Sequence, residues 1–543
     1  MLQERISPGN TYAGSDKITI TLDNTAPTVT LRDTDDDNLL AASDTVTITA
    51  DFSEVMTSTP TISIAGTSIS GQRMTKISGG ASGTGSATQI GGDIDGEAVE
   101  DYSGQSVSFS SDGSRMAIGA YANDGGGSNS GHVRIYDYNG SAWVQVGADI
   151  NGEAGSDYSG WSVSLSSDGS RVAIGAYNNN GGGSNSGHVR IYQYNNNSWS
   201  QLGADINGEA LNDNSGYSVS LSSDGSRVAI GARANDGNGA SSGHVRIYQY
   251  NNNSWSQLGA DINGEAADDR SGFSVSLSSD GSIVAIGAYK NDGTSGNSND
   301  NRGHVRIYQY NNNSWSQLGA DIDGEAVGDQ SGWSVSLSSD GSRVAIGAHN
   351  NDGNAYGSNS GHVRIYQYNN NSWSQLGADI DGEAVGDQSG WSVSLSSDGS
   401  RVAIGAHNND GGGSNSGHVR IYGYNGSAWV QVGADIDGEA AGDASGNSVS
   451  LSSDGSRVAI GAHLNDGNGN RSGHVRVYSL PRGESYQYLW DVDSGGAPSD
   501  GTYRATVAGS DLAGNAYSGT DSITFTLDTT APTVTLTDTD ADN

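Results

Sequence analysis

The stretch Ser334–Ala348 reads "SVSLSSDGSRVAIGA" and predicts two short strands joined by a tight turn. Val335 and Leu337 alternate with serines, which is the period-two pattern of a strand with one buried face. Asp340 and Gly341 are turn formers, and "RVAIGA" after them is the second strand. Because this stretch recurs along the chain, its repetition decides the fold.

The phrase "SSDGS" occurs seven times, and successive copies lie 56, 56, 56, 60, 58 and 56 residues apart. The extra residues fall between "VAIGA" and "GHVR", which predicts an exposed loop there. Further along each unit, "HVRIYQY" and "WSQLG" predict a third and a fourth strand on either side of the turn "NNNS". In the third strand of the unit quoted above, Val363 and Ile365 alternate with Arg364, Tyr366 and Tyr368. Four antiparallel strands in each of seven units predict a seven-bladed β-propeller.

The two ends of the repeat region are complementary. Ser86–Gly92 resembles a lone fourth strand, whereas the last unit ends after its third strand, Gly473–Leu480. A solenoid, the alternative architecture, would instead end in atypical polar repeats. We therefore expect the two ends to share the seventh blade, which closes the ring without an open sheet edge.

The flanking segments also repeat each other. Tyr12–Leu31 matches Tyr517–Leu536 at an offset of 505 residues, of which the propeller accounts for 400. The remaining 105 residues are the size of one immunoglobulin-like sandwich. We therefore predict an all-β chain in which the propeller is inserted in an immunoglobulin-like β-sandwich. The predicted boundaries are 1–24 for the last strand of a preceding Ig-like domain, 25–83 and 484–528 for the interrupted domain, 84–483 for the propeller, and 529–543 for the start of a following Ig-like domain.

Composition limits the possible partners. The chain has 62 acidic and 25 basic residues and a formal charge of −37, which disfavours nucleic acid and anionic membranes and favours cations, calcium above all. The absence of cysteine excludes a disulfide scaffold and a thiolate metal site. No stretch approaches the roughly 20 apolar residues of a membrane span, so we expect no direct membrane insertion. The first ten residues lack the apolar core of a signal peptide, and we expect the chain to be a piece of a longer protein.

The repeat "SGWSVSLSSDGSRVAIGA…GHVRIY" resembles the FG-GAP repeat of integrin α-subunit propellers in all seven units. The family often carries a calcium loop between strands one and two. Here that loop is "SSDGS", with a single Asp, so the resemblance implies that this calcium site is absent. The flanks, with "TAPTVTL", "FSEVM" and "DLAGNAYSGTDSITFTLD", resemble bacterial Ig-like domains of large surface proteins. This likeness implies an extracellular or cell-surface location on a bacterium.

Because successive antiparallel strands run in opposite directions, successive loops lie on opposite faces of the propeller. The one–two and three–four turns share one face, and the variable two–three loops share the other with the crossovers between blades, where binding residues are expected. Each crossover follows D-x-(D/N)-G-E-x-x-x-D, so the seven crossovers supply 25 acids. Alternating oxygen ligands suit calcium, but Asp and Asn also satisfy backbone N–H groups in long turns, and both interpretations stay open. The candidate calcium ligands are Asp321, Asp323, Glu325, Asp329, Asp379, Asp381, Glu383 and Asp387.

Aromatic and histidine side chains mark the same face. The residue after "SG" is aromatic in five units, where it can stack on a sugar or a partner or pack between blades. These residues are Trp161, Tyr217, Phe273, Trp333 and Trp391. Histidine follows "VAIGA" at His349, His407 and His463. Neighbouring sheets are spaced about 10 Å apart and zinc binds nitrogen near 2 Å, so we assign these histidines to the candidate ligand face rather than to a metal.

Near-identical blades offer no unique pairing of a nucleophile with its base, so we predict that the chain is not an enzyme. We predict an extracellular or cell-surface adhesion or ligand-binding module that presents a propeller face on an Ig-like stalk. Its expected partner is a protein or glycan, the flanking Ig-like domains lie in the same chain, and calcium is the expected cofactor. A structural spacer without a ligand and a polysaccharide-active propeller enzyme remain alternatives.

Overall fold

The computed structural model of the chain describes residues 29–32, 39–40, 45–52, 56, 59–65, 67–77, 86–293, 300–353, 357–480, 484–491, 501–510, 516–517 and 522–527. These residues form β-strands and turns, with no α-helix among them. The chain divides into two compact units. The flank unit comprises Met1–Ala50, Val55–Lys76 and Tyr486–Asn543, and the repeat unit comprises Asp51–Glu54 and Ile77–Ser485.

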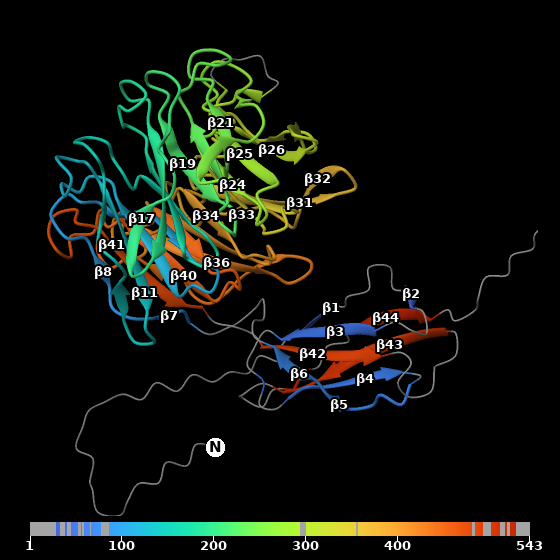
Figure 1. The fold of residues 1–543 in the computed structure, drawn as a ribbon. Coiled ribbons are helices and arrows are strands. Elements are labelled where there is room, and N and C mark those ends of the chain that lie inside the picture. The colour runs from blue at the N-terminus through green and yellow to red at the C-terminus, as the bar shows by residue number, and fades with distance from the viewer. Residues whose placement is uncertain are drawn as a thin grey trace, which may run out of the picture. The chain divides into compact units, whose positions relative to one another are not determined.

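The repeat unit contains seven antiparallel sheets arranged like propeller blades (Figure 1), each with four strands and a short fifth strand that pairs with the third. Sheet 1 has β9 (Ser103–Phe109), β10 (Arg115–Ala120), β11 (His132–Tyr138), β12 (Trp143–Gln145) and β13 (Ile150–Asn151). Sheet 2 has β14 (Ser162–Leu165), β15 (Arg171–Ala176), β16 (His188–Asn195), β17 (Ser198–Gln201) and β18 (Ile206–Asn207). Sheet 3 has β19 (Ser215–Leu221), β20 (Arg227–Ala232), β21 (His244–Asn251), β22 (Ser254–Gln257) and β23 (Ile262–Asn263).

The next sheets repeat this order. Sheet 4 has β24 (Ser274–Leu277), β25 (Ile283–Ala288), β26 (His304–Asn311), β27 (Ser314–Gln317) and β28 (Ile322–Asp323). Sheet 5 has β29 (Ser334–Leu337), β30 (Arg343–Ala348), β31 (His362–Asn369), β32 (Ser372–Gln375) and β33 (Ile380–Asp381). Sheet 6 has β34 (Ser392–Leu395), β35 (Arg401–Ala406), β36 (His418–Tyr424), β37 (Trp429–Gln431) and β38 (Ile436–Asp437).

Sheet 7 is assembled from both ends of the repeat region. Its first three strands are β39 (Ser448–Leu451), β40 (Arg457–Ala462) and β41 (His474–Ser479), and β7 (Thr88–Gln89) and β8 (Ile94–Asp95) complete it. Tyr478 pairs with Gln89, and Val475 pairs with Ile94. Figure 1 shows the blue β7 and β8 beside the orange-red β41. The lone fourth strand at the start of the repeats therefore pairs with the last third strand, as the sequence predicts.

The sheets pack in a closed series. Every pair of consecutive sheets shares an apolar cluster, and the seventh and first sheets share one that includes Val475, Val477, Val107 and Phe109. A matching series of backbone hydrogen bonds joins the second serine of each "SSDGS" turn to its neighbour. Its last member returns from Ser453 N to Ser111 O at 2.8 Å.

Both faces of the third strand are covered by neighbouring sheets, so side chains on both faces are buried. The alternation of Val363 with Arg364 is present, but His362 through Ile365 are all buried, because neighbouring sheets cover both faces. Arg364 is 5% exposed. A polar residue on such a strand therefore needs partners inside the protein.

The flank unit has two sheets that mix strands from before and after the repeats. Their orders are β1-β3-β42-β6 and β2-β44-β43-β4-β5. The strands are β1 (Val29–Arg32), β2 (Leu39–Leu40), β3 (Thr45–Phe52), β4 (Thr61–Ala65), β5 (Gln72–Arg73), β6 (Thr75–Ile77), β42 (Glu484–Asp491), β43 (Gly501–Ala508) and β44 (Ser522–Leu527). Ile48, Ile62 and Phe525 are fully buried in this unit. The predicted strand within 1–24 and the predicted domain start at 529–543 lie outside the described residues.

Deleting residues 86–92 should lower the melting temperature by several degrees. The deletion removes β7 and leaves Tyr478 and Leu480, which are 8% and 4% exposed, without their cover. Calorimetry of the full chain measures the effect. A matched control removes residues 295–298, which returns the longest unit to the common length of 56 and should change the melting temperature little. Equal melting temperatures for the two deletions would contradict closure by β7.

Candidate functional site

The turns opposite the variable loops are saturated with internal hydrogen bonds. In the second unit, Asp168 accepts bonds from Ser166 Oγ at 2.7 Å, Ser170 N at 2.9 Å and Ser170 Oγ at 2.8 Å. Burial raises the pKa of Asp168, but these hydrogen bonds outweigh it and hold the pKa below its usual value. The aspartate therefore stabilises the turn between strands one and two.

On the other face, the residues that follow "SG" form a continuous series, here named the inner rim. The preceding glycine is required because Gly390, for example, has φ +87° and a Cβ there would lie 2.6 Å from the carbonyl oxygen of His362. The five predicted aromatics contact one another in order around the sheets. Their ring centroids are 5.4 Å apart for Trp161–Tyr217, 5.0 Å for Tyr217–Phe273, 4.4 Å for Phe273–Trp333 and 4.6 Å for Trp333–Trp391.

Amide groups complete the inner rim where aromatic residues end. Trp391 Nε1 donates to Asn447 Oδ1 at 3.2 Å, and Asn447 Nδ2 donates to the backbone oxygen of Gln105 at 3.2 Å. Phe273 is 7% exposed, whereas Trp333 and Trp391 are half-buried. The rim therefore packs between sheets and also leaves part of its indole surface accessible.

Two of the three predicted histidines contact these aromatic rings, and the third, His463, lies near Tyr102. His349 lies 4.2 Å from Trp333 and 5.1 Å from Trp391, and His407 lies 4.0 Å from Trp391, measured between ring centroids. His463 lies 6.2 Å from Tyr102. Burial lowers the pKa of His349 and His407 to about 3 and that of His463 to about 4, so all three are neutral at pH 7.

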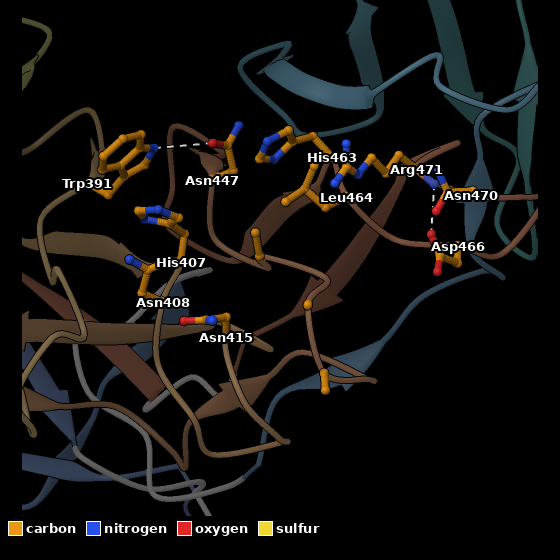
Figure 2. Close-up of a pocket in the computed structure, with 13 residues that line it drawn as sticks. Trp391, His407, Asn408, Asn415, Asn447, His463, Leu464, Asp466, Asn470 and Arg471 are labelled. Atoms are coloured by element: carbon orange, nitrogen blue, oxygen red, sulfur yellow. Dashed lines mark hydrogen bonds between the residues drawn. The ribbon is translucent and has the colours of Figure 1, made fainter.

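A pocket of about 480 Å³ opens between the loops of sheets 6 and 7, at the point where the inner rim changes from aromatic to amide. Trp391 and Asn447 line one side, with His407 beneath Trp391, and Arg471 lies at the other end (Figure 2). Arg471 is exposed, and its backbone N–H donates to Asp466 at 2.7 Å. The pocket thus combines an indole face, amides, a cation and a carboxylate.

The crossover acids have separate protein partners. Asp321 accepts from Gln317 Nε2 at 2.6 Å, and Asp329 accepts from the backbone N–H of Ala326 at 2.8 Å. In the next crossover, Asp379 accepts from Gln375 at 2.6 Å and Asp387 from Ala384 N at 3.0 Å. Glu325 and Glu383 form ion pairs with Arg364 and Arg420, whose guanidinium groups also donate to the carbonyl oxygens of Asp323 and Asp381. Calcium binding by these eight residues stays a prediction.

The structure brings together a group that sequence reasoning missed. Each histidine of "GHVR" lies beside a Glu of the preceding crossover and an Asp of its own crossover, as in Glu153–His188–Asp205. Each of these histidines is the first residue of a third strand, a position that by itself indicates only a structural role. The one available signal is the constant spacing of 17 residues between this His and the following Asp.

Comparison with known protein families supports the repeat assignment. Residues 151–192, 378–422 and 435–478 match the FG-GAP repeat. The chain therefore carries FG-GAP repeats within a strand-rich, propeller-like unit. No curated protein matches the chain. The described part of the chain also holds no helical segment with the length and apolarity that a bilayer span requires.

Several solved structures resemble the chain at low identity. Raptor of Chaetomium thermophilum is 11% identical, with a TM-score of 0.46 over 74% of this chain and 29% of its own. The β-propeller domain of the Trilobed protease of Pyrococcus furiosus is 10% identical, with a TM-score of 0.36 over 72% of this chain and 95% of its own. The acylaminoacyl peptidase of Pyrococcus horikoshii is 11% identical, with a TM-score of 0.39 over 72% of this chain and 52% of its own.

Buried histidines make stability depend on pH. Burial holds the pKa of His349 at about 3 in the folded chain, against about 6.5 when unfolded. Between these values the unfolded chain binds more protons, so stability is complete above pH 6.5 and falls as pH decreases. We expect the free energy of unfolding from urea titrations to be lower at pH 5 than at pH 7, by about 2 kcal/mol for one such histidine.

A matched variant isolates one histidine. His349→Phe keeps an aromatic ring between Trp333 and Trp391 and removes the proton acceptor, so its unfolding free energy should change less between pH 7 and pH 5. A free energy that stays constant or rises over this range in the unchanged protein would contradict the assignment of neutral buried histidines.

Proposed function

We propose that the repeat unit is a closed seven-bladed β-propeller of residues 84–483 and that its variable-loop face binds an extracellular ligand. We further propose that residues 25–83 and 484–528 form one Ig-like sandwich in which the propeller is inserted. The strand orders of the two flank sheets support this, because each sheet contains strands from both segments. The shared seventh sheet supports ring closure.

The pocket beside Trp391 is the observation that carries the binding function. Loops on a rigid scaffold are the usual place for ligand contacts, and partly apolar pockets with a few polar groups are the usual form. The pocket also lies where the chain departs from its own repeat. Arg471 stands where the first unit has Asn129, and Asn447 stands where five units have an aromatic residue.

The chemistry of the pocket favours a protein or glycan ligand. An accessible indole stacks on sugar rings or apolar side chains, and the nearby amides and Arg471 supply directional hydrogen bonds. Asp466 is the one carboxylate among the pocket's lining residues, and it already accepts a bond from Arg471 N. We therefore propose binding without catalysis. The net charge of −37 disfavours nucleic acid and anionic membranes as partners, and the resemblance to bacterial surface proteins supports a location at the cell surface.

A glycan array and a pull-down from matrix or host-cell surface proteins, both with the full chain, test this function. Arg471→Ala should reduce binding of any ligand found by about tenfold, since a pocket cation that pairs with the ligand contributes more than 1 kcal/mol. Asn129→Ala is the matched control, because it changes the equivalent position of the first unit. Absence of any ligand would favour a structural spacer, and equal loss in both variants would contradict the pocket assignment.

A further inference from the structure

The histidine groups between sheets form a second, sevenfold set of sites that is independent of the loop-face pocket. Each junction cluster combines a Glu from the crossover that leaves one sheet with a His and an Asp of the next sheet. The clusters are Glu97–His132–Asp149, Glu153–His188–Asp205, Glu209–His244–Asp261, Glu265–His304–Asp321, Glu325–His362–Asp379, Glu383–His418–Asp435 and Glu439–His474–Asp93. In the last cluster, Asp93 comes from the N-terminal end of the repeats.

In the first junction cluster, three donor atoms face one another at distances longer than hydrogen bonds. His132 Nδ1 lies 3.7 Å from Glu97 Oε2 and 4.0 Å from Asp149 Oδ2. His132 is 1% exposed, and its Nδ1 and Nε2 atoms have no hydrogen-bond partner. In the second cluster, Nδ1 of His188 is likewise buried without a partner and lies 3.8 Å from Glu153. Buried polar atoms of native proteins are paired as a rule, and where no protein group serves, an ordered water or an ion is the partner.

The two carboxylates are already oriented by their other oxygen atoms. Asp149 Oδ1 accepts a hydrogen bond from Gln145 Nε2 at 2.6 Å, which leaves Oδ2 directed at His132. Glu97 Oε1 lies 3.7 Å from the guanidinium of Arg134, which leaves Oε2 directed at the same histidine. Outer partners of this kind orient metal-binding carboxylates in proteins.

The charge of the first junction cluster and the distances between its donor atoms also suit a bound cation. The carboxylates of Glu97, Asp149 and the nearby Asp101 outnumber the one neighbouring cation, Arg134, so the cluster and its neighbours together carry a net negative charge. Ligands of a zinc ion lie roughly 3 to 3.5 Å from one another, so the Glu97 and Asp149 oxygens must each approach His132 Nδ1 by less than about 1 Å. The side chains of Glu97 and Asp149 are 43% and 31% exposed, which leaves them free to make this movement.

We propose that each junction cluster binds one divalent transition-metal ion of the Zn²⁺ class through His Nδ1, Glu Oε2 and Asp Oδ2. The imidazole nitrogen selects such ions over calcium, which prefers oxygen ligands. Each ion would join two neighbouring sheets, because the Glu belongs to one and the His and Asp to the next. The ion at Glu439–His474–Asp93 would also hold the N-terminal segment against the last strand of the repeats.

Native mass spectrometry of the full chain with added Zn²⁺ tests the proposal, because it counts bound ions individually. The unchanged protein should saturate at seven ions, and Glu97→Gln and Asp149→Asn should each bind one ion fewer. Glu100→Gln removes the same charge from the same crossover but lies outside the cluster, so it should still bind seven. Zinc absorption spectroscopy should show imidazole in the first coordination shell, and Zn²⁺ should raise the melting temperature where equimolar Ca²⁺ does not.

The outcomes separate clearly. One ion lost in both cluster variants and none in Glu100→Gln supports the proposal. Absence of saturable Zn²⁺ binding would overturn the proposal, because water would then fill the junction clusters. The loss of one ion in Glu100→Gln as well, or a zinc coordination shell without imidazole, would also overturn it. The glycan and pull-down measurements depend on neither result.

Discussion

One buried arginine in every sheet links the packing of the repeats to the chemistry of their loop face. These arginines, in the third strands, are 4–6% exposed, and each guanidinium donates to a carbonyl oxygen of the preceding crossover at 2.6–2.8 Å. Each also lies 3.3–3.7 Å from the crossover Glu. A buried cation without partners is costly, so the crossover must keep this position for the sheets to stack.

This constraint explains why the acids are arranged as they are. Because the arginine anchors the crossover, Glu153 reaches the next sheet and lies beside His188, while Asp205 approaches the same histidine from its own sheet. The acids that appear in the sequence as one acidic pattern therefore separate into turn, ion-pair and junction-cluster positions. The aromatic inner rim depends on the same stacking, since each ring contacts the ring of the adjacent sheet.

Much of the repeat unit could be predicted from its sequence. Alternation and turn residues give the four strands of a unit, and the missing fourth strand at Leu480 predicts the pairing with Gln89 that the structure contains. The short strands such as β18 were not predicted, because two residues carry no period. The burial of Arg364 could not be predicted either. Alternation indicates the face of the strand on which a side chain lies, but not whether a neighbouring sheet covers that face.

The junction clusters show why a candidate site is difficult to recognise in a repetitive sequence. In a chain of near-identical units most pairs of positions outside the variable loop keep a constant spacing, so the 17 residues between His188 and Asp205 are a signal that many structural pairs share. The pocket at Trp391 was hidden for a related reason, because its bond to Asn447 joins two units and depends on which sheets are neighbours. The predicted domain boundaries stay predictions.

The central claim is that the seven sheets close into a ring through sheet 7, and amide hydrogen exchange tests it most directly. Ser453 N donates to Ser111 O at 2.8 Å across the closing junction, and Ser397 N makes the same 2.8 Å bond to Ser453 O within the series. In a closed ring, peptides that contain Ser453 and Ile90 exchange as slowly as those that contain Ser397. Exchange within seconds at Ser453 and Ile90, with slow exchange at Ser397, would contradict closure.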